Sequence, residues 1–214
     1  MRSLCPPAQP WRRIPGTVKS ATSYWRALSP GESAAWGKAV ADVDVAAARV
    51  LAYMWHFMSY ESTKPRATND LLYMAVDVPN SHSMFQIGEY TVPLASNRVF
   101  ACKWTWRREA SDDFVVALTT LQDLPWSGEK ARARGLIDKH KSAEKTVLGV
   151  LRGSYRITPL AANVCRVTLI GQSILGGIIP NRVMSALVKF SLDRVKLIQD
   201  KCVRERAGGV RAGC

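Results

Sequence analysis

The chain has 214 residues, 47% of them apolar, which is enough for one domain with a core of ordinary size. Lysine and arginine total 30 against 17 for aspartate and glutamate, a net charge of +13 that predicts an anionic partner such as a membrane surface, a phosphorylated headgroup or a nucleic acid. No run approaches the roughly 20 apolar residues of a membrane-spanning helix, and the 5 scattered cysteines lack CxxC spacing, which predicts free thiols in a reducing, cytoplasmic compartment.

The ends of the chain differ from its middle in composition. Residues 1–35 are basic and rich in proline, and we expect them to form a disordered leader. A transit peptide is one function for such a leader, and a disordered tail or an imperfect gene start is the alternative. We expect the folded domain at residues 36–207 and a disordered tail at 208–214, because two glycines follow the last predicted helix.

Beyond Trp36, hydrophobic periodicity predicts a strand, a helix and then a run of strands. Apolar residues recur at every second position up to residue 45, as in a half-buried strand, and they take helical spacing from 46 to 57. Four strands with short, turn-rich links follow, and a longer loop at 122–141 leads into two more strands. The six strands are predicted at residues 71–78, 84–92, 99–107, 114–120, 145–158 and 164–172.

A long helix completes the pattern. From near Asn181 to Arg206, apolar residues form a stripe at helical spacing, and most of the cations lie off it. Short links predict antiparallel pairing of the strands, and the resulting sheet needs a cover for its apolar face. The sequence therefore predicts an α+β fold in which a curved antiparallel sheet wraps around a long C-terminal helix, with a cavity where the helix stands off the sheet.

Two motifs carry a resemblance to a known family. Residues Pro93–Phe100 are similar to a Pro-Leu, loop, Arg-Asp-Phe signature that enters a strand ending in tryptophan, here Trp104 and Trp106. Residues Val167–Gln172 and Gly176–Asn181 are similar to a last strand, a Gly-x-Ile-Pro turn and the start of a lid helix. In both motifs, and in the strand and helix that precede the meander, the chain resembles the START lipid-transfer family, whose fold is called helix-grip. The resemblance covers residues 36–206.

Two departures limit what the resemblance carries over. The aspartate that follows the signature arginine in the family is Val99 here, so no functional role is transferred to Arg98. The first helix and first strands of the family have no counterpart before Trp36, which predicts an N-terminal part that is either shortened or disordered.

The resemblance implies a hydrophobic lipid in an internal cavity. Two-residue alternation puts the side chains of residues 100, 102, 104 and 106 on one face of their strand. On the next strand, alternation does not decide which face points inward, and we assign the face of residue 116 to the cavity. The alternative is that all these side chains pack on one another as an ordinary core. The predicted lipid-contacting residues are Phe100, Cys102, Trp104, Trp106, Val116 and Leu118 of the sheet and Met184, Leu187, Val188 and Ser191 of the last helix.

Cations in the long loop predict a second kind of site. They suit docking on an anionic membrane, at about 1 kcal/mol for each cation near the surface. Contact with a nucleic-acid backbone and a merely solvated face are the alternatives. We disfavour nucleic acid because alternation puts the tryptophans opposite Lys103 and Arg107, which weakens a stacking platform. The predicted docking residues are Lys130, Arg132, Arg134, Lys139 and Lys141.

The sequence contains none of the common catalytic or metal-binding motifs. It has no G-x-S-x-G elbow, P-loop, H-E-x-x-H or dinucleotide fingerprint, and its three histidines are dispersed. We therefore expect no enzyme activity, no metal and no cofactor. The expected function is that of a monomeric cytoplasmic lipid carrier or sensor, peripherally associated with membranes. The alternatives are a basic nucleic-acid-binding or scaffold protein with a solid core, and a cyclase or hydratase of the helix-grip type.

Overall fold

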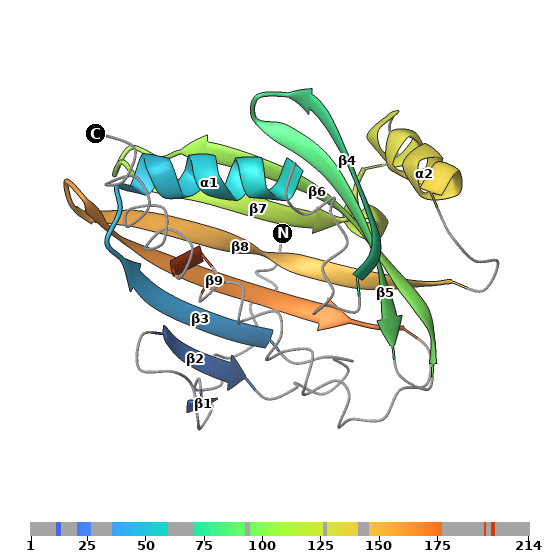
Figure 1. Ribbon diagram of the computed structural model, residues 1–214, viewed down its shortest axis with the longest axis horizontal. Helices are drawn as coiled ribbons and strands as arrows, with labels where there is room; N and C mark the ends of the chain where they lie inside the picture. The colour runs from blue at the N-terminus through green and yellow to red at the C-terminus, as the bar shows by residue number, and fades with distance from the viewer. Residues whose placement is uncertain are drawn as a thin grey trace, which may run out of the picture.

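A computed structural model describes residues 12–13, 21–26, 36–59, 71–92, 95–125, 128–140, 146–176, 195 and 198–199. In it, nine strands form one sheet, with helices packed on both faces (Figure 1). The strand order is β1-β2-β3-β9-β8-β7-β6-β5-β4, and neighbours in this order pair antiparallel. This confirms the predicted α+β class and the predicted meander. The strands are β1 (Arg12–Arg13), β2 (Ala21–Arg26), β3 (Trp36–Val43), β4 (Leu71–Asn80), β5 (Ser83–Val92), β6 (Ala95–Arg108), β7 (Phe114–Thr120), β8 (Val147–Ala161) and β9 (Val164–Ile174).

Strands β1 and β2 lie in the part of the sequence that composition assigned to a disordered leader. Strand β2 pairs with β3 over its whole length, from Ala21 opposite Ala41 to Arg26 opposite Trp36. The sheet therefore begins before Trp36, and the expectation of a wholly unstructured leader is corrected at these two strands. The sequence of β2, Ala-Thr-Ser-Tyr-Trp-Arg, has good β propensity, which the surrounding prolines and cations obscure.

Strands β6 and β8 come together where the shorter strand β7 between them ends. Strand β7 has 7 residues, whereas its neighbours β6 and β8 have 14 and 15. Beyond the end of β7 these two neighbours pair directly and in parallel, with Arg98 to Phe100 opposite Val147 to Gly149. The chain between β7 and β8 leaves the sheet at this point, which is why the two longer strands can meet.

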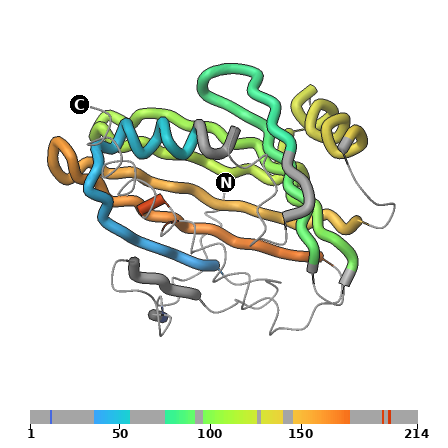
Figure 2. The backbone as a smooth tube through the Cα atoms, viewed as in Figure 1, coloured from blue at the N-terminus to red at the C-terminus, as the bar shows by residue number. Residues whose placement is uncertain are grey.

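Helix α1 (Ala47–Ser59) covers one face of the sheet, which we call the inner face. In Figure 2 it runs lengthwise above the strands, and it contacts β4, β7, β8 and β9. Its apolar side Val50, Leu51 and Met54 is buried, as the helical spacing predicts. The cluster that it forms with the inner face, called the inner cluster, also holds Trp104 and Tyr155.

The segment 122–141, which the sequence predicts to be a loop, is largely helical, so this prediction is wrong. A 3-10 helix η2 (Leu121–Asp123) and helix α2 (Gly128–His140) pack on the opposite, outer face, beside β4, β5 and β6. Ala133, Leu136 and Ile137 take the i, i+3, i+4 spacing of a helix and pack on Phe85 and its neighbours. This short apolar stripe escaped notice because the segment is dominated by charge and contains Gly135.

The predicted C-terminal helix is described at three positions. Val195, Ile198 and Gln199 are helical, and the first two are buried in the inner cluster, on the same side of the sheet as α1. Gln199 Nε2 donates a hydrogen bond to the carbonyl oxygen of Asp42 at 3.0 Å, which ties this point to the end of β3. The rest of the helix predicted at 181–206, and the tail at 208–214, lie outside the described residues.

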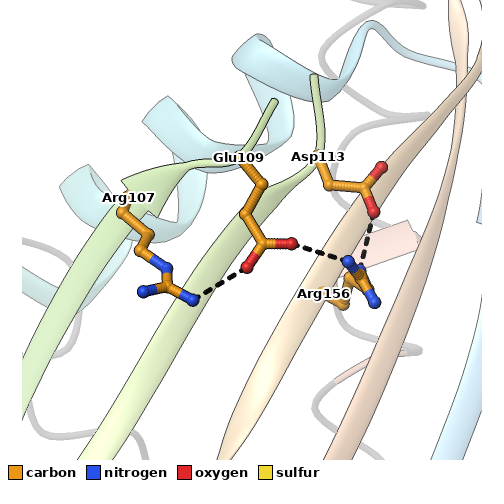
Figure 3. A network of polar contacts seen from close by, with 4 residues as sticks. All are labelled: Arg107, Glu109, Asp113 and Arg156. Carbon is orange, nitrogen blue, oxygen red and sulfur yellow. Dashed lines mark hydrogen bonds and ion pairs between the residues drawn. The ribbon is translucent and has the colours of Figure 1, made fainter. Parts of the chain in front are cut away.

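Ion pairs hold the outer face and its turns. Arg156 donates to Asp113 Oδ2 and to Glu109 Oε2, both at 2.6 Å, and Arg107 reaches Glu109 Oε1 at 2.9 Å (Figure 3). Both carboxylates raise the pKa of the Arg156 guanidinium, the hydrogen bond to Asp113 most of all. These contacts link the β6–β7 turn to β8. Within this turn, Asp112 has a φ of 62°.

Candidate functional site

The structure places most of the predicted β6 residues on the inner face. Cys102 and Trp104 are buried in the inner cluster, and Trp106 packs against its border. The ring of Trp106 lies 4.4 Å from that of His82, and its Nε1 donates to the carbonyl oxygen of Ser81 at 2.8 Å. Trp106 is therefore held at the β4–β5 turn, away from the rest of the face.

The choice of face on β7 agrees with the structure. Val116 and Leu118 are buried in the inner cluster, opposite Trp106 and Trp104 of β6. Around α1 these side chains pack on one another, as the alternative of an ordinary core supposes. A second region of the inner face adjoins this packed core, and it is the candidate ligand surface: it runs along β6 from Trp104 through Cys102 to Phe100, past the end of β7.

Phe100 lies in that second region, beyond the end of β7. Its ring covers Gly149 so closely that a Cβ atom there would lie 2.8 Å from Phe100 Cδ1. The ring also meets Tyr90 edge to face, with centroids 5.7 Å apart. Gly149 is thus required by the position of the Phe100 ring, and the two aromatic rings line one end of the inner face.

Three glycines make a strip without side chains across the inner face. Gly37 of β3 lies opposite Gly171 of β9, which lies opposite Gly153 of β8. A Cβ on Gly153 would overlap the carbonyl oxygen of Ile170 and lie 2.9 Å from Gly171 Cα. The backbones of β8 and β9 therefore approach each other closely here. Sequence reasoning missed this strip, although each glycine occupies an inward position of its strand.

Three buried polar side chains lie on the same inner face as the glycine strip. Gln86 and Thr120 are both paired with Cys102, and Ser173 is paired with Leu151. Because Cys102 and Leu151 point to the inner face, Gln86, Thr120 and Ser173 point to it too. All three are 0–7% exposed. An apolar surface with a few polar groups is the usual composition of a small-molecule site. We define the candidate site as this half of the inner face.

Arg98 closes one end of the candidate site. Arg98 is 3% exposed, and its guanidinium donates to the carbonyl oxygens of Leu175, at 2.8 Å, of Gly176, at 3.3 Å, and of Ser96. The first two carbonyls directly follow the last strand, and the third lies at the start of β6. Arg98 thus fastens the entrance of β6 to the exit of β9, a structural role that sequence reasoning did not assign.

Helix α2 carries the predicted membrane-docking cations. Arg134 and Lys139 are exposed and Lys130 is half-buried. Arg132 is bound by both oxygens of Asp77, which raises the pKa of its guanidinium, and it stands over the Phe85 ring at 5.9 Å. Asp77 therefore balances the charge of Arg132 within the protein, while the Arg132 side chain is still 46% exposed, and its docking on a membrane stays a prediction. Lys141 lies outside the described residues.

The predicted roof of the site lies outside the described residues, with Met184, Leu187, Val188 and Ser191. Within the described ranges, no group of three or more His, Cys, Asp and Glu side chains could hold a metal ion. In the same part of the chain, no helix is long and apolar enough to span a membrane.

The arrangement is that of a helix-grip fold, because a curved antiparallel sheet holds helical residues of the C-terminal segment on its inner face. No protein-family model matches the chain, and a search of curated proteins found no match either.

Solved structures identify the fold as that of START domains. Human STARD10 is similar over 94% of this chain and 76% of its own, with a TM-score of 0.67 and 14% identity. The lipid transfer and protein localization domain of human StarD13 matches over 90% of this chain and 89% of its own, with a TM-score of 0.63 and 15% identity. A STAR-related lipid transfer protein fragment from Xanthomonas axonopodis matches over 90% and 98%, with a TM-score of 0.64 and 15% identity. The chain therefore has the START fold, as the sequence motifs predict.

Proposed function

We propose that this protein binds one hydrophobic lipid between the candidate site and the C-terminal helix, and carries or senses it at membranes. The observation that carries the proposal is the inner face itself. A strip of glycines without side chains lies beside Leu151, the buried Ser173 is paired with Leu151, and the buried Gln86 is paired with Cys102 on the same face. The fold shared with domains named for lipid transfer supports the same function.

Burial of the lipid supplies the binding energy without a reactive group. Removing 300 Å² of apolar lipid surface from water is worth about 7 kcal/mol, at about 25 cal/mol per Å². We propose accordingly that the protein binds its lipid without transforming it. The proposed contacts are Phe100, Cys102, Trp104 and Leu151, and we leave Trp106 out because the β4–β5 turn holds it.

Lipid extraction tests this function. The full chain is incubated with phosphatidylcholine vesicles, separated from them, and weighed by native mass spectrometry. We expect a protein that carries one lipid. A protein that takes up no lipid from vesicles of any composition contradicts the proposal, and RNA binding with a steep salt dependence would then favour the nucleic-acid alternative.

A charge placed in the site should abolish the uptake. Leu151→Arg puts a cation on the inner face, where a buried charge without a partner is costly. Leu148→Arg is the matched control, because Leu148 lies on the same strand and is 43% exposed. We expect at least a tenfold loss of extracted lipid for the first variant and wild-type extraction for the second. Equal extraction by both folded variants would remove Leu151 from the site.

We also propose that the protein is cytoplasmic and touches anionic membranes through α2. Arg134 and Lys139 are the exposed cations that support this contact. Replacing either by glutamine should weaken binding to phosphatidylserine vesicles about fivefold, the equivalent of about 1 kcal/mol per cation. Arg107→Gln, which removes an exposed cation near the end of β6, is the control. If all three variants bind alike, α2 does not form the docking surface.

A further inference from the structure

Trp104 has a polar group that the described part of the protein leaves without a partner. The side chain is 1% exposed, and its Nε1 is buried without a hydrogen-bond acceptor among the described residues. Folded proteins pair nearly all such buried donors, because an unpaired one loses its hydrogen bonds to water and gains nothing in return. The unpaired N–H therefore calls for a physical explanation.

The described surroundings of Trp104 contain no acceptor for its Nε1–H group. The side chain lies between Met84 of β5 and Leu118 of β7, its cross-strand neighbours, and stacks on Tyr155 with ring centroids 6.0 Å apart. Trp106 on the same face of the same strand has its Nε1 satisfied by Ser81. The same strand thus satisfies one indole and leaves the other unpaired.

We propose that the Nε1–H of Trp104 donates a hydrogen bond to a neutral oxygen of the bound lipid, an ester carbonyl or a hydroxyl. This inference rests on the proposed function. The oxygen is neutral because the described neighbours of Trp104, which are Met84, Leu118 and Tyr155, carry no charge that could balance a phosphate or carboxylate. Cys102, two residues away on the same face, connects Trp104 to the candidate site.

The inference predicts a preference between lipids that differ in a single kind of group. Diester phosphatidylcholine is compared with its diether analogue, which lacks the carbonyl oxygens, and cholesterol with its 3-deoxy analogue, which lacks the hydroxyl. We expect the wild-type chain to bind the oxygenated member of at least one pair about fivefold more tightly, as one net hydrogen bond allows. The pair that shows the preference identifies the source of the oxygen.

Variants at Trp104 assign the preference to its N–H group. Trp104→Phe should bring the ratio within a pair close to one, whereas Trp106→Phe, whose N–H is paired with Ser81, should keep the wild-type ratio. If Trp104→Phe does not fold, benzothienylalanine at position 104 keeps the size of the side chain and replaces N–H by sulfur. In the wild type, the ¹⁵N-indole proton of Trp104 should move downfield only with the oxygenated lipid.

The outcomes separate this inference from the proposed function. A chain that binds both members of each pair equally, with an unmoved Trp104 indole signal, binds lipid but overturns the inference. A preference that survives the loss of the Trp104 N–H also overturns it. A chain that binds none of the four lipids contradicts the proposed function and the inference together.

Discussion

Gly153 lies where β8 and β9 approach too closely for a side chain, which makes Gly153→Ala a direct test of the inner face. The added Cβ would overlap the carbonyl oxygen of Ile170 and lie 2.9 Å from Gly171 Cα. Both atoms belong to the backbone, so neither can rotate away, and the two strands must move apart. The close approach and the glycine strip would be lost together.

The expected cost follows from this geometry. Overpacking a well-packed core typically costs 1–3 kcal/mol, and we expect about 3 kcal/mol here because the overlap is with backbone atoms of β9 and not with a side chain. For a chain of this size, that corresponds to a fall of about 6–12 °C in Tm. Chemical denaturation followed by circular dichroism measures the free energy of unfolding, and a thermal scan gives Tm.

Gly135→Ala is the matched control. Gly135 lies inside α2, and a Cβ there would meet nothing within 4 Å. The same substitution should therefore stabilise the protein by about 0.5–1 kcal/mol, because alanine has the better helix propensity. If Gly153→Ala unfolds at the same denaturant concentration as the wild type, the close approach of the two strands is wrong.

Two further predictions concern the turns and the outer face. Asp112 has a φ of 62°, so Asp112→Val should lower the free energy of unfolding by about 1–2 kcal/mol. Asp112→Gly should stay within about 0.5 kcal/mol of the wild type, because it loses only an exposed ion pair with Arg108. Equal stability of the two variants would contradict the positive φ of Asp112. The hydrogen bond from Arg166 lowers the pKa of Asp42 below its usual value of about 3.8. This pair therefore stabilises the fold above the usual pKa and ceases to do so as the pH falls through the lowered pKa. Because both side chains are about half exposed, the contribution is below about 1 kcal/mol, and Asp42→Asn should remove it from the acid-unfolding curve; an unchanged curve would show that the pair contributes nothing.

Much of the fold could be predicted from local patterns. The alternation along Phe114–Thr120 gave the bounds of β7, and the helical spacing after residue 45 gave α1 to within two residues. Both predictions succeed because each element buries one face, so its apolar residues recur with the period of the strand or the helix. The same alternation put Cys102 and Trp104 on the inner face.

Elements whose order depends on partners could not be predicted in this way. Strand β2 is identified by its pairing with β3, because its own six residues lie in a basic, proline-rich segment. Helix α2 has only a weak apolar stripe. Its helical structure could be inferred only from the tertiary structure, in which the stripe packs on Phe85 and Ile87 of the outer face. In each case the partner lies far away in the sequence.

The sequence by itself determined the order of the strands along the chain and the direction in which the Trp104 side chain points, because both depend on periods of two and 3.6 residues. The tertiary structure decided which side chains lie together. It alone shows that Gly37, Gly153 and Gly171 meet in register, that Arg98 joins two distant strand ends, and that the indole of Trp104 has no described acceptor. These properties depend on the register between strands, and register is fixed by packing across the whole sheet, which no local segment records.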